Sequence, residues 1–380
     1  MNRLLYCLGI LIAANLIYAA SAEMQKQFSV QPGETISLDL RTGGSVRITG
    51  WDRNEVLVAA RPRGEDAADC NIEITRVPGG VNVLSEYEGS RNRHSTDFRF
   101  EISAPKKYNV SLDSSGGGIT IIDLNGNFKG DTGGGEITIK GSEGTVYLST
   151  GGGQIHLEDS KLEGKVSTGG GQIVLRNVRG NVKTTTGGGQ VIHEANFTDR
   201  PDVLASSDEK VVEIKTGGGA IRIDSAPLGA DVETGGGEIT IHSAKRFAKA
   251  TTGGGDIEIK SIDGSVKAST GAGDVSVQMT GNAQSEGHDV SLSSGKGDIT
   301  LILPPSFSGS VYVKLGYTRT HDDVDIVSDF DLQRDKTDEW SSAEGTPRRY
   351  IYGKGQLGSG KNRIRIETVN GNVYLKKAAK

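Results

Sequence analysis

Cysteine is nearly absent from this 380-residue sequence, which contains only Cys7 and Cys70. Cys7 lies in an N-terminal segment that we expect to be removed, so Cys70 has no second cysteine with which to form an internal disulfide. We expect Cys70 to be a small buried side chain rather than a nucleophile. Packing and hydrogen bonds must therefore stabilise the fold.

Proline and aromatic residues are also scarce, with 9 prolines and an aromatic content of 5%. The formal net charge is −5, and residues of both signs are interspersed along the chain. The sequence lacks the basic stripe of a nucleic-acid-binding protein and the basic amphipathic helix of a membrane-surface protein. We therefore expect no nucleic-acid partner.

The sequence has no apolar run long enough to span a membrane comfortably. Its longest is a short run near the N-terminus, Leu4 to Tyr18, which follows Arg3. Ala20-Ser21-Ala22 then provides a small-x-small cleavage pattern. These features predict a signal peptide over residues 1–22 and an exported mature chain that begins at Glu23. We expect this chain in the periplasm or at the cell surface, with no membrane span after cleavage. An uncleaved anchor is the alternative.

Glycine, in contrast, is abundant: the 55 glycines include many triplets that follow a threonine. The residue before each glycine-rich turn serves as an anchor for the repeat. The anchors are Ser114, Thr132, Thr150, Thr168, Thr186, Thr216, Thr234, Thr252, Thr270 and Ser294. Most steps between anchors are 18 residues, except for 30 after Thr186 and 24 after Thr270. Self-similarity at a fixed period is the signature of a solenoid.

Aliphatic and polar residues alternate between the glycine turns. Aliphatic residues occupy the fifth and seventh positions after the anchor, as in Ile137 and Ile139, and others precede it, as in Val146 and Leu148. This period-two pattern predicts two half-buried strands per repeat and excludes helix. One repeat cannot offset its own backbone entropy, so the repeats must stack. The sequence predicts an all-β, single-stranded β-solenoid with coils of 18 residues about 4.8 Å apart.

The two ends of the chain lack the clean period, and we expect irregular β caps there. Val46 and Ile48 match the inward positions of a degenerate coil over residues 41–58, and Thr368, Val373 and Leu375 restore the register near the C-terminus. The predicted divisions are a signal peptide (1–22), an N-terminal β region with the degenerate coil (23–110), solenoid repeats (111–303), and a C-terminal cap with a final coil (304–380), irregular over 304–362.

The glycine triplets require a recurring reason, because glycine loses more entropy on folding than any other residue. We expect them at tight corners, where the backbone has positive φ and neighbouring coils leave no room for Cβ atoms. Each anchor threonine has inward parity, so its hydroxyl can bond a turn N–H and form a stacked hydroxyl ladder. The alternative is an anion-binding nest of backbone N–H groups, but no lysine or arginine recurs beside the triplets.

Two outward columns, four residues after the anchors, are candidate sites. Their members are Gln154, Gln172 and Gln190, followed by Asp256, Asp274 and Asp298. Stacked amides can form a hydrogen-bonded ladder. Stacked carboxylates repel each other unless a cation bridges them, so the three aspartates are a weak candidate calcium site. Their simpler interpretation is as turn residues.

The 30-residue step after Thr186 contains an insertion, which in solenoids forms a protruding loop on a binding face. Phe197 and Arg200 within it are a weak candidate partner-binding pair, with packing inside the loop as the alternative. Neither the six histidines nor the P-loop-like segment 355–362 carries chemistry, since the latter ends in Asn362 and precedes a strand pattern. We expect no catalytic residues and no cofactor.

Four stretches together resemble a bacterial family of envelope proteins known as the putative-adhesin family: GGSVRITGWDRNEV, the serial TGGGxIxI turns, LPPSFSG, and GQLGSGKNRIRIETVNGNVYL. The resemblance implies a right-handed β-helix without catalytic residues. We therefore expect an exported, non-enzymatic protein with a structural or adhesin-like role at the cell envelope, whose partner is an envelope protein or a glycan. The alternative is a carbohydrate-active β-helix enzyme, which would place several carboxylates or an arginine cluster in a groove.

Overall fold

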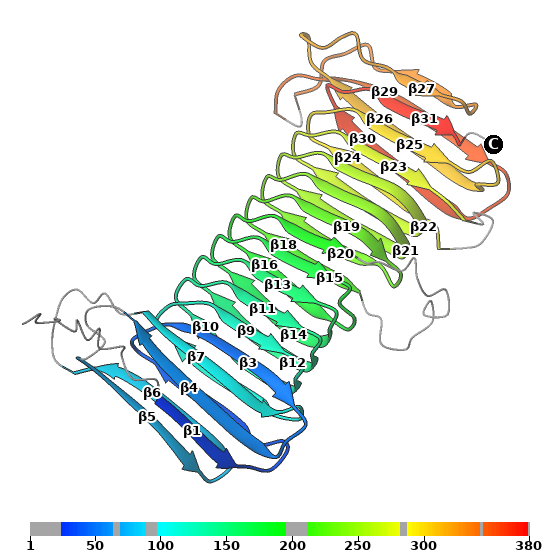
Figure 1. Ribbon diagram of the computed structural model, residues 1–380. Coiled ribbons are helices and arrows are strands. Elements are labelled where there is room, and N and C mark those ends of the chain that lie inside the picture. The colour runs from blue at the N-terminus through cyan, green and yellow to red at the C-terminus, as the bar shows by residue number, and fades with distance from the viewer. Residues whose placement is uncertain are drawn as a thin grey trace, which may run out of the picture.

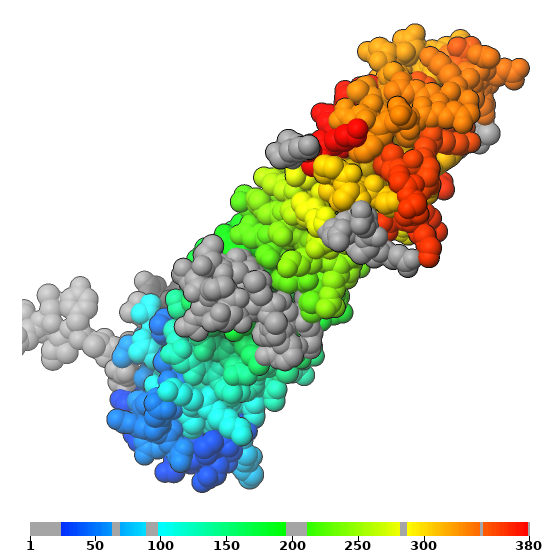
Figure 2. Space-filling view, turned by 90° about the vertical axis from the view of Figure 1, so that its right-hand side faces the viewer, coloured from blue at the N-terminus to red at the C-terminus, as the bar shows by residue number. Residues whose placement is uncertain are grey.

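The computed structural model describes residues 24–63, 69–88, 97–194, 211–281, 287–342 and 345–378. These residues form 31 strands of one hydrogen-bonded sheet and contain no α-helix. Accordingly, nothing in the described chain forms a helix long and apolar enough to cross a membrane. The molecule is elongated, with the N-terminal strands at one end and the C-terminal strands at the other (Figures 1 and 2). The all-β prediction is confirmed.

Two parallel ladders form the long middle part. Ladder A contains β8 (Asn109–Ser114), β10 (Asn125–Thr132), β12 (Glu143–Thr150), β14 (Lys161–Thr168), β16 (Val182–Thr186), β18 (Val212–Thr216), β20 (Ala230–Thr234), the second halves of β21 (Ile239–Thr252) and β22 (Ile257–Thr270), and β24 (Val290–Ser294). Ladder B contains β9 (Ile119–Ile122), β11 (Ile137–Lys140), β13 (Ile155–Glu158), β15 (Ile173–Arg176), β17 (Val191–Glu194), β19 (Ile221–Ala226), the first halves of β21 and β22, β23 (Val275–Met279) and β25 (Ile299–Leu303). One strand of each ladder with its two corners is called a coil below.

The strand register follows the sequence period. Ile137 pairs with Ile119 on one side and with Ile155 on the other, an offset of 18 residues in each direction. The inward residues of both ladders are buried in one continuous hydrophobic core, as the alternation predicted. Each buried aliphatic side chain contributes roughly 1.5–3 kcal/mol, and stacking gives both backbone edges of a coil a partner.

The glycine corner leads from ladder A to ladder B. The third glycine of each triplet that follows a threonine packs closely against the coil before it. A Cβ atom on Gly153, for example, would lie 2.0 Å from the carbonyl oxygen of Gly135. The first glycine, Gly151, is equally crowded against Gly133, whereas a Cβ on the middle Gly152 would meet nothing within 4 Å. The prediction of close approach is confirmed. The prediction of positive φ is wrong for the triplets that follow a threonine, none of which lies in the left-handed region, but it holds for Gly117 in the first glycine turn, whose φ is 99°.

Buried anchor hydroxyls join successive glycine corners. Thr150 Oγ1 donates to the carbonyl of Gly135 at 2.8 Å and accepts the N–H of Gly153 at 3.2 Å. The bond to the preceding coil recurs at Thr132, Thr168, Thr186, Thr216, Thr234, Thr252 and Thr270. The predicted hydroxyl ladder is thereby confirmed, and it fastens each corner to its neighbour.

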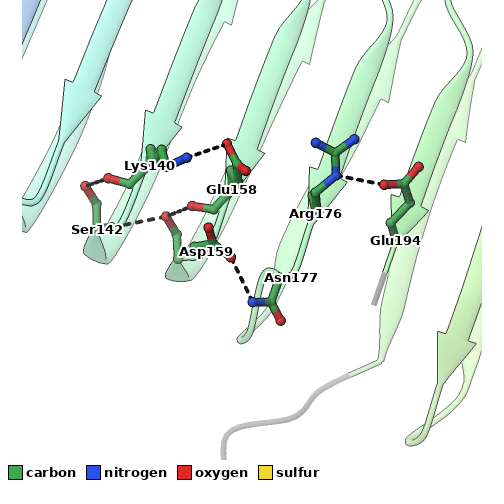
Figure 3. A network of polar contacts seen from close by, with 8 residues as sticks. Lys140, Ser142, Glu158, Asp159, Arg176, Asn177 and Glu194 are labelled. Carbon is green, nitrogen blue, oxygen red and sulfur yellow. Dashed lines mark hydrogen bonds and ion pairs between the residues drawn. The ribbon is translucent and has the colours of Figure 1, made fainter. Parts of the chain in front are cut away.

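The opposite corner, from ladder B back to ladder A, carries the left-handed backbone instead. Its column contains Asp123, Gly141, Asp159 and Asn177, with φ values of 55°, 61°, 48° and 55°. Asn177 donates to Asp159 at 2.8 Å, and beside this column Lys140 pairs with Glu158 at 3.2 Å (Figure 3). Asparagine, aspartate and glycine are the residues that tolerate this conformation best. We call this the open corner, because both interruptions of the regular 18-residue series fall there.

The interruptions are additions to a coil rather than breaks in the ladders. The longest step in the regular series lies between β17 and β18, yet Thr186 still pairs with Thr216. The step after Thr270 lies between β23 and β24, and Thr270 still pairs with Ser294. Strands β4–β7 and β26–β29 likewise follow ladder B strands, β3 (Ser45–Trp51) and β25 respectively. The glycine corner contains no addition in the coils from β8 to β25, whereas the corresponding corner of the outer C-terminal coil, between Leu315 and Ile326, is longer than the one between their partners Thr368 and Val373.

The N-terminal end begins with the degenerate coil that the sequence predicted. Strand β2 (Thr35–Leu40) pairs with β8, and Val46 and Ile48 in β3 pair with Ile119 and Ile121. A further coil, formed by β6 (Gly80–Tyr87) and β7 (Asp97–Pro105), lies outside it. Antiparallel strands β1 (Met24–Ser29), β4 (Glu55–Arg63) and β5 (Cys70–Val77) complete this end. Cys70 is half-buried against the core rather than fully buried.

The C-terminal end is built the same way. Strands β30 (Asn362–Val369) and β31 (Val373–Lys377) continue the two ladders, with Thr368 opposite Ser294 as predicted. Outside them lie β26 (Gly309–Tyr317) and β27 (Ile326–Ser328), followed by antiparallel β29 (Arg349–Leu357) and β28 (Gln333–Lys336). The prediction that residues 304–362 are irregular is therefore wrong. Their strands pair with segments distant in sequence, which the local pattern does not reveal.

One inward position of ladder B holds a histidine. His193 occupies the column of Leu175 and Ile223, beside a cavity of about 40 Å³ that Thr184 also lines. Its Nδ1 atom is buried and, within the described structure, has no hydrogen-bond partner. Desolvation lowers the pKa of His193, because burial disfavours the imidazolium.

We expect His193→Leu to stabilise the protein, and to do so more at pH 5 than at pH 8. At pH 8 the gain is about 1 kcal/mol, from removal of an unsatisfied buried nitrogen. Below about pH 6.5 the unfolded chain takes up a proton that the folded chain resists, so wild type loses stability as the pH falls. Urea denaturation at both pH values measures the difference. His156→Leu, on the same ladder but outward, controls for loss of an imidazole, and an equal gain at both pH values would contradict the prediction.

Candidate functional site

The three predicted aspartates lie on successive coils, as the register required. Asp256 Oδ1 accepts the backbone N–H of Asp274 at 2.8 Å, and Asp274 Oδ1 accepts that of Asp298 at 2.7 Å. Asp298 Oδ1 in turn accepts the N–H of Asn372 at 2.7 Å. Each carboxylate thus has a structural role that requires no cation. Across the described residues, no cluster of three or more histidine, cysteine or acidic side chains is arranged to hold a metal ion.

The hydrogen bonds of this column predict that an alanine and an asparagine substitution at Asp274 will differ in stability. Asp274→Ala removes the acceptor for the Asp298 N–H and should lower the free energy of unfolding by about 1 kcal/mol. Asp274→Asn keeps an oxygen acceptor and should stay close to wild type. Chemical denaturation of both variants compares them, and equal losses would show that the bond to Asp298 is not what Asp274 contributes.

Calcium binding by the aspartate column stays a prediction. Calorimetric titration of wild type and Asp274→Asn with calcium tests it: a heat that the variant lacks would support a shared ion. Equal heats, or none, would leave these aspartates as turn residues.

The other candidate residues, the glutamine column and the pair in the insertion, provide less evidence of a site. In the glutamine column, Gln172 Nε2 donates to Gln190 Oε1 at 3.4 Å, while Gln154 bonds His156 at 3.0 Å, so the amide ladder is partial. Phe197 and Arg200 lie outside the described residues, and their partner-binding role stays a prediction.

The site that the sequence analysis missed is a groove on the outward face of ladder A, toward the C-terminal end. Its volume is about 540 Å³, within the usual range for ligand sites. The groove crosses β21, β22, β24, β30 and β26. Its central column runs in register from Lys249 to Lys267, Ser291, Arg365 and Tyr312. At one strand spacing per step, this column is roughly 19 Å long.

Positive charge predominates in the groove, which four cations and one carboxylate line. The carboxylate, Asp289, pairs with Arg363 at 2.7 Å, and this contact holds the pKa of Asp289 below its usual range. Lys249 pairs with Asp231 at 3.0 Å, outside the groove lining. Arg365 pairs with Glu367, which also lies outside the groove lining, and of the four cations only Lys267 has no ion-pair partner within the described part of the chain. The groove therefore attracts anions.

Aromatic rings stand at the two ends of the groove. Phe247 lies over Gly229, where a Cβ atom would clash with the ring at 2.4 Å, and its side chain also lines the groove. At the other end, the Arg365 guanidinium lies 5.7 Å from the centre of the Tyr312 ring. Tyr352 follows Tyr312 on the neighbouring strand, with ring centres 6.4 Å apart. Ser265 and Ser291 lie between these ends, and Ser310 lies beside Tyr312 on β26.

The groove escaped the sequence analysis because its residues come from five separate segments. The expectation of no basic stripe considers the linear sequence, whereas pairing of β30 with β24 brings Arg365 into the column of Lys267. One signal was available. Arg365 lies three residues before Thr368, as Lys267 lies three before Thr270, so the predicted register places both arginine and lysine in one column.

Comparison with known proteins adds little to what the geometry indicates about the function of the chain. No protein-family model matches the chain, and no curated protein matches it. A putative cell adhesion protein from Clostridium sporogenes shares 13% identity, with 94% of this chain and 100% of that chain covered and a TM-score of 0.18. A putative adhesin from Bacteroides fragilis shares 14% identity, with 74% of this chain and 97% of that chain covered and a TM-score of 0.28. A putative lipid binding protein from Parabacteroides distasonis shares 8% identity, with 94% of this chain and 98% of that chain covered and a TM-score of 0.27. At these TM-scores we base no argument on the likeness, and membership of the adhesin family stays a prediction.

Proposed function

We propose that this protein is an exported, non-enzymatic binding protein of the bacterial cell envelope, and that the ladder A groove binds its ligand. The 18-residue parallel register supports classification as a single-stranded β-solenoid, for which the resemblance implies a right-handed β-helix. The signal peptide (1–22), the divisions at residues 110 and 303, and a periplasmic or surface location belong to the same proposal.

The observation that carries the proposal is the construction of the groove. Its polar side chains occupy outward positions of strands whose inward residues form the core, so a rigid sheet holds them in place. Rigid presentation lowers the entropy lost on binding. Lys267 and Arg365 project from neighbouring parts of one column, which suits recognition of an extended anionic ligand.

The enzymatic alternative, a carbohydrate-active β-helix, finds weaker support in the same groove. Two arginines are present, as that alternative expected, but among the described lining residues the sole carboxylate is Asp289. A general acid in glycoside cleavage needs a raised pKa, whereas Arg363 lowers the pKa of Asp289. The Asp289–Arg363 ion pair is suited to holding two neighbouring strands together, and less suited to proton transfer.

Binding of the mature chain to an envelope fraction of the source bacterium tests the proposal. We expect wild type to bind and Lys267→Glu to bind at least tenfold more weakly, because the reversal changes the charge of the groove. Lys129→Glu is the matched control: Lys129 is an exposed member of the same column, roughly 34 Å away at the far end of ladder A. Equal binding by all three proteins would show that the groove is not the binding site.

A further inference from the structure

We propose that the groove takes a linear anionic polysaccharide, a sugar polymer bearing carboxylate or sulfate groups, that lies along the axis of the coil stack. This inference rests on the proposed binding function and narrows it to one class of ligand. Three features of the groove carry it: the spacing of its cations, the position of its aromatic rings and the hydroxyl groups between them.

The cations follow the long axis rather than surrounding one point. Lys249, Lys267 and Arg365 belong to one column, in which neighbouring strands are about 4.8 Å apart. The column continues past the groove, since Tyr312 pairs with Lys354 on β29. A compact anion would contact one or two of these groups, whereas an extended polymer with regularly placed charges can contact them all.

The uncharged groups suit sugar rings. Phe247 and Tyr312 provide apolar ring faces at the two ends, against which the apolar face of a sugar can pack. Ser265 and Ser291 provide hydroxyls between them and Ser310 provides one beside Tyr312, each able to donate and accept a hydrogen bond. A polymer of hydroxylated rings with acidic substituents matches both kinds of group.

Single-stranded nucleic acid fits the arrangement less well. Such ligands stack successive bases on aromatic side chains in a strongly basic groove. Here the two aromatic rings of the groove stand roughly 19 Å apart along the column, and the net charge of the whole chain is −5. The observations therefore favour a polysaccharide, and a nucleic acid becomes one outcome of the test.

The test measures binding of the mature chain to four immobilised polymers: polygalacturonate, dextran sulfate, neutral dextran and a single-stranded oligodeoxynucleotide. We expect binding to polygalacturonate, to dextran sulfate or to both, at least tenfold weaker in 200 mM than in 50 mM NaCl, and none to neutral dextran. The first two polymers distinguish carboxylate from sulfate as the recognised group. Oligonucleotide binding as tight as that of either anionic polysaccharide would overturn the inference, as would equal binding to neutral dextran.

Variants locate the contact. Lys267→Glu and Arg365→Glu should each weaken binding of the anionic polysaccharide at least tenfold, and Lys129→Glu should stay within twofold of wild type, although it changes the net charge equally. Circular dichroism confirms that all three fold. Equal loss in all three variants would overturn the groove as the site. Groove-dependent binding to envelope fractions without binding to either anionic polysaccharide would overturn this inference alone and leave the proposed function standing.

Discussion

Gly153→Ala should lower the free energy of unfolding by about 3 kcal/mol or more, although it adds one methyl group. The new Cβ would lie 2.0 Å from the carbonyl oxygen of Gly135, so the two coils would have to separate at this corner. Separation would stretch the bonds by which Thr150 joins both coils. The same close approach recurs in the coils on either side, so the displacement cannot be absorbed locally.

Gly152→Ala is the matched control, one residue away. A Cβ there meets nothing within 4 Å, and the sequence already places Ala272 and Lys296 at the equivalent position of other coils. We expect this variant to match wild type or gain a few tenths of a kcal/mol, since alanine restricts the unfolded chain. Thermal and urea denaturation of both variants provides the comparison. Similar stabilities would mean that the corner is looser than the structure indicates.

Ile239→Asp should abolish folding or reduce stability by more than about 4 kcal/mol. Ile239 is fully buried, and its neighbours along the inward column are Ile221 and Ile257. A carboxylate there would lie in an aliphatic interior without a donor or a counterion. Circular dichroism should show loss of the β signal at temperatures where wild type is folded.

Thr300→Asp introduces the same residue on the same ladder, at an outward position between Ser276 and Tyr374. We expect a change below about 0.5 kcal/mol, because the new charge stays in water. If Ile239→Asp melted within a degree or two of wild type, the inward assignment of its column would be wrong.

The inward columns could be predicted from the sequence because they depend only on local parity. Each of them follows from the distance to an anchor such as Thr150, and the same counting placed Val46 and Thr368 correctly in atypical coils. It would also have placed His193 inward, seven residues after Thr186, although a histidine does not read as a core residue.

The ends and the groove depend on pairings that local parity does not contain. Strands β6 and β7 follow β3 in the sequence but lie outside it in space, and β26 likewise lies outside β30. The alternation of apolar and polar residues does not distinguish this spatial order of strands from one in which the strands stack in sequence order. The groove required both the register and the order of the coils, since Arg365 meets the column of Lys267 only through β24.

The contrast between the two corners has a consequence for how such a chain can change over evolutionary time. The glycine corner is closed by a hydroxyl and a carbonyl from adjacent coils, so an inserted residue there would disrupt several coils at once. The open corner has accepted additions of very different lengths while Thr186 and Thr270 kept their partners. Along the coils from β8 to β25, new sequence is thus tolerated at one border and excluded from the other. One of these additions supplies Tyr312 and Ser310 to the groove, which places the acquisition of binding chemistry at the border where growth is permitted.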